Sequence, residues 1–300
     1  SEDDGDYNTA VGYQALMAQT GTSGEVGNTA VGYQAGLAVT TGTQNTLMGY
    51  HAGKAVLGGS TNTIIGSEAG KALNSGGANT IVGRHSAYSL TTGDDNVAIG
   101  QFALYTGTTQ SDNVAIGTSA LQNIRGEDSV AVGYQTGQYA TGSQNTFVGS
   151  NAGKGGTTSA PFSSGQENTA MGYQALTNFT TGGNNTAIGR KALENVSSGG
   201  YNVAVGNEAG LNVTTGAENV FLGISAGGNT TDVDKAVLIG GGAATGVLTS
   251  DADGTVAIGY TAGQSLTSGI GNIAIGYQAL DAEDDGDYNT AIGYQALTSQ

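Results

Sequence analysis

Residues 289–297 read NTAIGYQAL and residues 8–16 read NTAVGYQAL, so two stretches near opposite ends of the chain differ by one methylene. Variants of this stretch recur between them, and each carries a central glycine. Of the 16 intervals between these 17 glycines, 11 span 17 residues and the others span 16, 16, 19, 20 and 23. A fixed period of this kind indicates an array of stacked structural repeats. The glycines are Gly12, Gly32, Gly49, Gly66, Gly83, Gly100, Gly117, Gly133, Gly149, Gly172, Gly189, Gly206, Gly223, Gly240, Gly259, Gly276 and Gly293.

The composition favours an ordered chain with few charges. Glycine makes up 54 of 300 residues without the every-third period of collagen, and only 11% of residues are charged. The net charge of −16 argues against binding to nucleic-acid phosphates or to anionic lipid. No apolar run reaches the length of a membrane span. We therefore expect no nucleic-acid partner and no membrane contact.

The three residues before each repeat glycine have the pattern of a short strand that is apolar on both faces. The position directly before the glycine is aliphatic or methionine in all 17 repeats, and the position three before it is Thr, Val or Ile. Between them lies a column of 11 alanines and six larger apolar residues. Because side chains alternate along a strand, this middle column points to the opposite face. A strand that is apolar on both faces is expected to be buried on both.

From this pattern we predict that the column directly before the glycine fills the interior of each coil, with the threonine methyls beside it. The alanine-rich middle column is then predicted to be buried against another copy of the chain. The predicted interface residues are Ala10, Leu47, Ile64, Ile81, Ala115, Phe147, Phe221 and Leu238.

The predicted fold is an all-β parallel β-solenoid, or β-roll, of about 17 coils with a 17-residue period. One array covers residues 1–300, with an insertion at 150–167 and irregular coils at 228–258. Each coil is expected to contain a strand, a corner at a glycine with positive φ, a second extended segment and a Thr/Gly turn. Asparagine stands four residues before the glycine in 14 repeats, which predicts a ladder of stacked amides. The similarity of the two ends suggests a fragment of a longer fibre.

The segments DNVAIG (95–100 and 112–117) and DSVAVG (128–133) resemble the head repeats of trimeric autotransporter adhesins. The longer NTAIGYQAL form is similar to repeats of trimeric phage-type and bacterial surface fibres. This resemblance implies a left-handed parallel β-roll, three chains around one axis, an extracellular location on a cell surface or virion, and a role in adhesion. The period is longer here than in the adhesin heads.

Three groups of residues could carry chemistry instead of structure. His51, Glu68 and His85 share the column two after the glycine, but histidines two coils apart lie about 9.6 Å from each other, too far to share one zinc ion. Tyrosine follows the glycine in eight repeats, where a stacked ladder could support the coils or bind glycans. Acidic turns could bind calcium, with Asp251, Asp253, Asp285 and Asp287 as the candidates.

The insertion at 150–167 is a candidate partner-binding loop, because extra residues in a repeat array are displaced outward from the stack. It contains Lys154, Phe162 and the only proline of the chain, Pro161.

No catalytic constellation stands out, so we do not expect an enzyme. The sequence favours a segment of an extracellular trimeric fibre that contacts a host-surface receptor or glycan. The alternative is a monomeric solenoid that binds ice or another ligand through its threonine column (Thr9, Thr29, Thr46, Thr63 and Thr80). Replacement of this threonine by valine in other repeats argues against a binding array.

Overall fold

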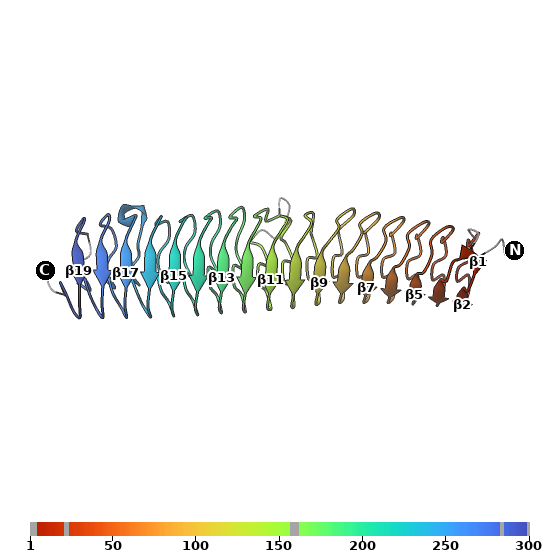
Figure 1. Ribbon diagram of the computed structural model, residues 1–300, viewed down its shortest axis with the longest axis horizontal. Helices are drawn as coiled ribbons and strands as arrows, with labels where there is room; N and C mark the ends of the chain where they lie inside the picture. Colours follow the sequence, from red (N-terminus) through yellow and green to blue (C-terminus); the bar gives the residue numbers. More distant parts are fainter. Residues whose placement is uncertain (1–4, 21–23, 157–161, 283–284, 299–300) are drawn as a thin grey trace. The chain divides into compact units, whose positions relative to one another are not determined.

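The computed structural model describes residues 5–20, 24–156, 162–282 and 285–298, and the chain divides into two compact units, 1–144 and 145–300. Each unit is a stack of coils in which every coil supplies one three-residue strand (Figure 1). The predicted all-β parallel β-solenoid with a period near 17 residues is confirmed. Within the described residues the only helical element is one 3-10 turn, η1 (Ser250–Ala252), in the segment predicted to be irregular.

The strands of a unit pair in parallel, each with the next strand along the chain. Equivalent repeat positions face one another, as in the pairing of Ala98 with Ala115. Unit 1–144 contains β2 (Thr9–Val11), β4 (Thr29–Val31), β5 (Thr46–Met48), β6 (Thr63–Ile65), β7 (Thr80–Val82), β8 (Val97–Ile99), β9 (Val114–Ile116) and β10 (Val130–Val132), and a separate two-residue pair, β1 (Gly5–Asp6) with β3 (Gly24–Glu25).

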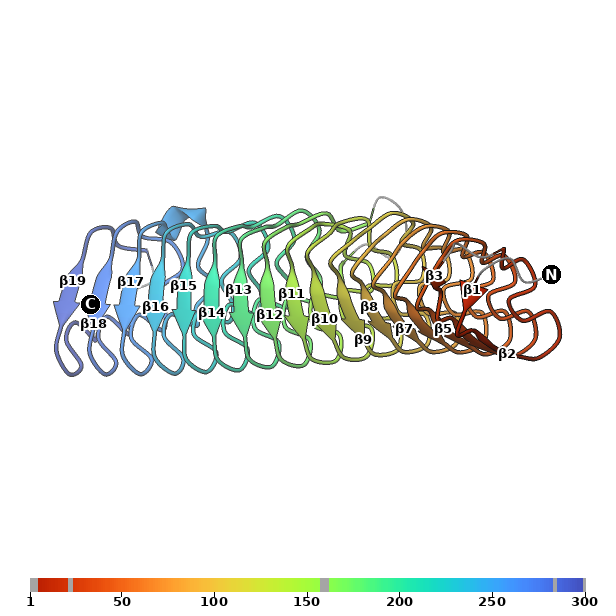
Figure 2. The same ribbon diagram turned by 45° about the vertical axis from the view of Figure 1, so that its right-hand side comes forward.

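Unit 145–300 has the same organisation. Its strands stand side by side from green to blue in Figure 1, and Figure 2 shows the loop that follows each of them before the next strand begins. They are β11 (Thr146–Val148), β12 (Thr169–Met171), β13 (Thr186–Ile188), β14 (Val203–Val205), β15 (Val220–Leu222), β16 (Val237–Ile239), β17 (Val256–Ile258), β18 (Ile273–Ile275) and β19 (Thr290–Ile292).

The middle residue of each strand points into the coil. Apart from Ala10 at the first coil, these residues are buried within the single chain, and Leu47, Ile64, Phe147 and Phe221 are 0% exposed. The prediction that the column directly before the glycine fills the interior is therefore wrong. That column, and the Thr/Val column two residues earlier, lie on the outward face of the sheet and are half-buried or exposed.

At two facing positions the narrow interior accepts at most one large side chain per coil. These are the middle strand residue and the residue four after the glycine. Phe221 faces Gly227, where an added Cβ would lie 2.5 Å from the Phe221 ring. Where the strand residue is Ala115, the facing residue is instead the buried Leu121. All six large strand residues face Gly or Ala, namely Gly53, Gly70, Ala87, Gly153, Gly227 and Ala244. Matched volumes of this kind are what a close-packed core requires.

The repeat glycine allows successive coils to approach closely at the corner. Gly100 has φ +133°, and a Cβ there would lie 2.5 Å from the carbonyl oxygen of Gly117 on the next coil. The other repeat glycines up to Gly276 have φ between +125° and +143°, and those other than Gly133 show the same close contact with the next coil. The predicted positive-φ corner is confirmed, and backbone-to-backbone contact explains why no side chain is accepted.

The predicted asparagine ladder is also confirmed, and it lies inside the chain. Asn202 Nδ2 donates to Asn185 Oδ1 at 3.1 Å and to the carbonyl oxygen of Gly216 at 2.8 Å. Its own Oδ1 accepts the backbone N–H of Asn219 at 3.1 Å and the Asn219 amide at 3.0 Å. Every polar atom of the buried amide is thereby satisfied, which offsets the cost of removing it from water.

The half of the coil after the glycine is built from turns rather than from the second extended segment that we predicted. The residues two after the glycine are left-handed in nearly every coil, as at Gln34 (φ 53°) and His51 (φ 55°). Backbone bonds still join neighbouring coils here, for example from Gln34 N to the Tyr13 carbonyl at 2.9 Å. Side chains two after the glycine consequently form outward-facing ladders.

The inward assignment of the middle column can be tested with two substitutions in one unit. Phe221→Ala should lower the free energy of unfolding by about 3–5 kcal/mol, because it leaves a cavity where the chain cannot collapse. Ile188→Ala removes an outward side chain that is 37% exposed in the single chain and should cost about 1 kcal/mol when unfolding is measured at concentrations at which the chain is monomeric. Denaturant unfolding of both variants measures the difference. Equal losses would show that the two columns are equally buried.

Candidate functional site

The outward face of each strand carries an uninterrupted apolar ladder. In the column directly before the glycine, Met48 is 42% exposed, Ile99 is 36% exposed and Met171 is 46% exposed. The column two residues earlier, of Thr and Val, lies beside it on the same face. We call these two columns the outward face; it consists of the first and third residues of the strands from β2 to β19, excluding the β1–β3 pair.

The outward face, and not the middle column, is the surface on which another molecule could sit. Leu47, Ile64, Ile81, Ala115, Phe147, Phe221 and Leu238 are fully buried within one chain, so the prediction that they form an oligomer interface is wrong. Ala10 is exposed, but it lies on the first coil of the same inward column. Because both faces of the strand are apolar, the residue pattern did not distinguish interior from exterior.

The threonine column is also placed differently from our prediction. Thr46, Thr63 and Thr80 are half-buried on the outward face instead of pointing inward. In unit 1–144 five successive strands begin with Thr and the next three begin with Val; in unit 145–300 three begin with Thr, four with Val, and the last two with Ile and Thr. The outward face therefore consists of two parallel rows. One row contains Thr, Val and Ile side chains, and the other contains aliphatic or methionine side chains.

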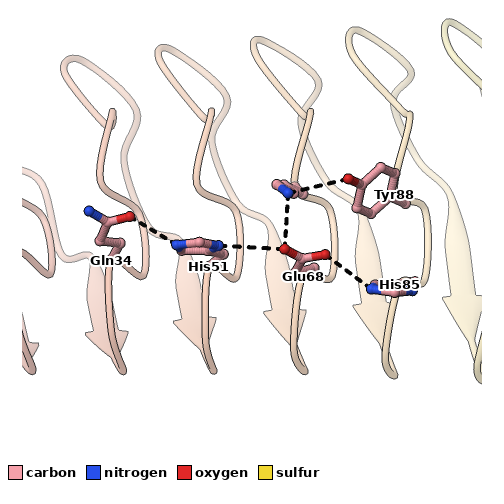
Figure 3. A network of polar contacts seen from close by, with 6 residues as sticks. Gln34, His51, Glu68, His85 and Tyr88 are labelled. Atoms are coloured by element: carbon pink, nitrogen blue, oxygen red, sulfur yellow. Dashed lines mark hydrogen bonds and ion pairs between the residues drawn. The ribbon is translucent and has the colours of Figure 1, made fainter.

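A partly buried polar cluster lies on the turn side of unit 1–144 (Figure 3). Glu68 stands between two histidines, with its Oε1 3.6 Å from His51 Nδ1 and its Oε2 3.0 Å from His85 Nε2. Lys71 Nζ donates to Glu68 Oε1 at 2.9 Å and to the Tyr88 hydroxyl at 3.2 Å. His51 Nε2 lies 2.9 Å from Gln34 Oε1, which extends the ladder to the preceding coil.

The electrostatics of this cluster favour a neutral His51 beside a charged Glu68–Lys71 pair. Burial lowers the pKa of His51 below 6.5, and the positive charges of Lys54 and Lys71 act in the same direction, against the pull of Glu68. The hydrogen bond from Lys71 lowers the pKa of Glu68, and the same bond raises the pKa of Lys71. His51 is 9% exposed, so its ring is largely removed from water.

The His–Glu–His ladder suggested by the sequence is thus real, but it is more buried than a solvated ladder. Lys71 and Tyr88 were not anticipated as members; the spacing of three residues between Glu68 and Lys71 was the available signal. Within the described ranges no three His, Cys, Asp or Glu side chains come together in an arrangement that could hold a metal ion. The cluster joins four consecutive coils and has the geometry of a structural network.

Six of the eight tyrosines after the repeat glycine form two stacked ladders. Tyr13, Tyr33 and Tyr50 stack with centroids 5.3 and 5.5 Å apart and interplanar angles of 13° and 14°. Tyr260, Tyr277 and Tyr294 stack with centroids 5.6 and 5.2 Å apart. Neighbouring rings cover the faces they turn toward each other, which favours the structural interpretation over glycan stacking for these two ladders.

The acidic candidates for calcium form two pairs on two different coils, and one member of each pair accepts a backbone hydrogen bond. Asp253 Oδ1 accepts the backbone N–H of Asp234 at 2.8 Å, and Asp287 Oδ1 accepts the backbone N–H of Ile270 at 2.8 Å. Asp94 Oδ1 likewise accepts the backbone N–H of Gly77 at 2.6 Å. These aspartates stand six residues before their repeat glycines, so each closes a turn of the preceding coil. Asp251 and Asp285 are exposed.

The predicted partner-binding loop is only partly within the described residues. Pro161 lies outside them. Lys154 and Phe162 are half-buried, and Ser163 is buried with its hydroxyl 2.7 Å from the Phe179 carbonyl oxygen. The residues that follow, up to Glu167, return to the regular coil.

The chain matches no protein-family model, and no curated protein matches it. None of the helical structure among the described residues is long and apolar enough to cross a membrane.

The polar cluster predicts a pH dependence of stability. Because the folded pKa of His51 is lowered, its contribution is fully present above about pH 6.5 and is lost as the pH falls below that value. Glu68 adds a second loss as the pH falls through its own lowered pKa. His51→Gln keeps a hydrogen-bonding partner for Gln34 and removes the first of these losses. Unfolding measured between about pH 7 and pH 5 should depend less on pH in the variant than in the wild type; equal slopes would contradict the assignment.

Proposed function

We propose that this chain is a structural segment of an extracellular homotrimeric fibre, which mediates or displays adhesion from a cell surface or a virion. The observation that carries the proposal is the outward face, an apolar ladder that continues over every coil of both units. The fibre character, the trimer and the location come from the resemblance of the DNVAIG and NTAIGYQAL repeats.

The size of the outward face supports self-association. Eight strands in one unit and nine in the other, spaced about 4.8 Å apart, give faces about 34–38 Å long. At about 10 Å wide, each face has an area of roughly 350 Å². The largest apolar patch on a typical monomer covers about 300–600 Å² and is often functional, so a patch of this size on each unit is compatible with an association site. The two columns contain only Thr, Val, Ile, Leu and Met and therefore carry no charge. Such a face fits a partner surface of the same composition.

A trimer brings three such faces together around one axis, so that each chain contacts two copies. The role of the segment would be mechanical. Backbone hydrogen bonds and asparagine amides run from coil to coil within a unit, so pulling along the stack loads many bonds in parallel. Such a segment suits a spacer that holds a receptor-binding or glycan-binding part of a fibre away from its surface.

The proposal is tested by the mass of the chain in solution. The wild-type chain should be a trimer by light scattering. Ile99→Asp or Ile188→Asp places a charge on the outward face and should yield monomers with an unchanged β-sheet circular dichroism signal, because neither side chain enters the interior. Gln101→Glu, also a new charge but on the turn side of the coil of Ile99, is the matched control and should remain trimeric. A monomeric wild-type chain would overturn the proposal.

The outward threonines support one alternative function, an ice-binding solenoid. Five successive threonines from Thr9 to Thr80 form a regular row beside aliphatic side chains. A surface of this type would act as a monomer and would need the row exposed. A monomeric mass together with thermal hysteresis that is lost in Thr63→Lys would favour this alternative over the fibre.

A further inference from the structure

Unit 145–300 has a surface trough that none of the preceding features uses. It has a volume of about 590 Å³ and is open to solvent. It runs over the corner that precedes the strands, and none of its lining residues belongs to the outward face. We propose that this trough binds a neutral oligosaccharide, with Tyr201 as its stacking platform.

The floor of the trough is bare backbone. Gly183 and Gly200 occupy equivalent positions six residues before their repeat glycines. A Cβ at Gly183 would lie 2.9 Å from the Gln166 carbonyl oxygen, and one at Gly200 would lie 3.0 Å from the Gly183 carbonyl oxygen. Because neither glycine carries a side chain, the main chain is uncovered here and a flat ligand can approach it.

One wall is a row of hydroxyl groups on successive coils. Ser164, Thr181 and Ser198 all stand eight residues before their repeat glycines. Their hydroxyl groups make no hydrogen bond to other described residues and remain available to a ligand. Their spacing follows the coil spacing of about 4.8 Å, close to the length of one sugar unit in an extended chain. Successive sugars can therefore meet successive hydroxyls.

The opposite wall combines an aromatic ring with acceptors. Glu167, Asn184, Tyr201 and Glu218 follow one another on four coils, each in a left-handed conformation that turns its side chain outward. Tyr201 is 66% exposed, and no other described ring stacks on it, in contrast to the two tyrosine ladders. An uncovered ring presents an apolar face to the C–H face of a pyranose, while the carboxylates and the amide accept its hydroxyl protons.

The charge of the trough selects the class of ligand. Its lining includes two carboxylates and no Lys or Arg, so phosphorylated, sulfated or sialylated ligands would be repelled. The lining contains no aliphatic side chain larger than Ala217, which disfavours a lipid or an apolar peptide. The corresponding trough of unit 1–144 is lined by Asp94 and Asp95 with no aromatic ring, and should not bind sugars.

Saturation-transfer difference NMR with cellotriose, triacetylchitotriose, sialyllactose and trilysine tests this proposal. At least one of the two neutral trisaccharides should bind with a Kd of about 0.1–1 mM, and sialyllactose should not bind. Tyr201→Ala should weaken this binding at least tenfold, with an unchanged circular dichroism spectrum because the ring is exposed. Tyr173→Ala removes a similarly exposed tyrosine outside the trough and should have no effect.

Three results would overturn the proposal. They are the failure of both neutral trisaccharides to bind, binding that Tyr201→Ala leaves unchanged, and binding of trilysine in their place. The proposal does not depend on trimer formation. A monomeric chain that binds the trisaccharide would therefore support the sugar site and contradict the proposed fibre function.

Discussion

The close approach of successive coils at the repeat glycine is the constraint on which the rest of the structure depends. Each corner places a glycine backbone where a Cβ would collide with the carbonyl oxygen of the next coil. This close approach allows the backbone hydrogen bonds between coils to form at strand spacing, and that spacing in turn brings the asparagine amides, the tyrosine rings and the polar turn side chains within reach of their counterparts. A longer separation at the corner would open all of these ladders at once.

The ladders solve a problem that a thin solenoid creates. Its interior is thin, so it offers less apolar burial than a globular core. Polar groups must then be placed in the interior and at the corners, and each must be satisfied. The asparagine column does this inside the coil, and aspartates such as Asp94 and Asp234 do it at the turns, where each accepts a backbone N–H of the preceding coil. The acidic turns thus have a structural role.

Much of the fold could be predicted from the sequence, because the repeat glycine and asparagine columns follow directly from backbone geometry. The direction of the strand faces could not, because the columns of Ile99 and of Ala98 are both apolar. One signal could have decided which face points inward. The size of the middle strand residue is matched to the size of the residue four after the glycine. Phe147 and Phe221 occur with glycine there, while Ala98 and Ala115 occur with leucine. Such compensation is expected only of side chains that share a closed space.

The candidate sites were less predictable than the fold. The His51–Glu68–His85 column was visible in the alignment of repeats, but the contribution of Lys71 depends on the tight turn after the glycine, which the sequence did not reveal. The trough around Tyr201 depends on glycines at Gly183 and Gly200 that look like ordinary turn residues. In a repeat array, binding features arise where one coil departs from the column pattern, and the geometry of the corner decides whether that departure opens a surface.

The most direct test of the corner constraint compares two glycine substitutions in unit 145–300. Gly206 (φ +143°) would place a Cβ 2.4 Å from the Gly223 carbonyl oxygen, whereas at Gly293 (φ +132°) the nearest atom to an added Cβ is the Ala296 Cβ, 4.0 Å away. Both substitutions to alanine carry the cost of a similar positive φ that only glycine readily adopts. Gly206→Ala should lower the free energy of unfolding by at least about 1 kcal/mol more than Gly293→Ala, because overpacking against backbone cannot be relieved by a rotamer change. Equal losses from the two substitutions would show that close approach at the glycine corner does not constrain the coils.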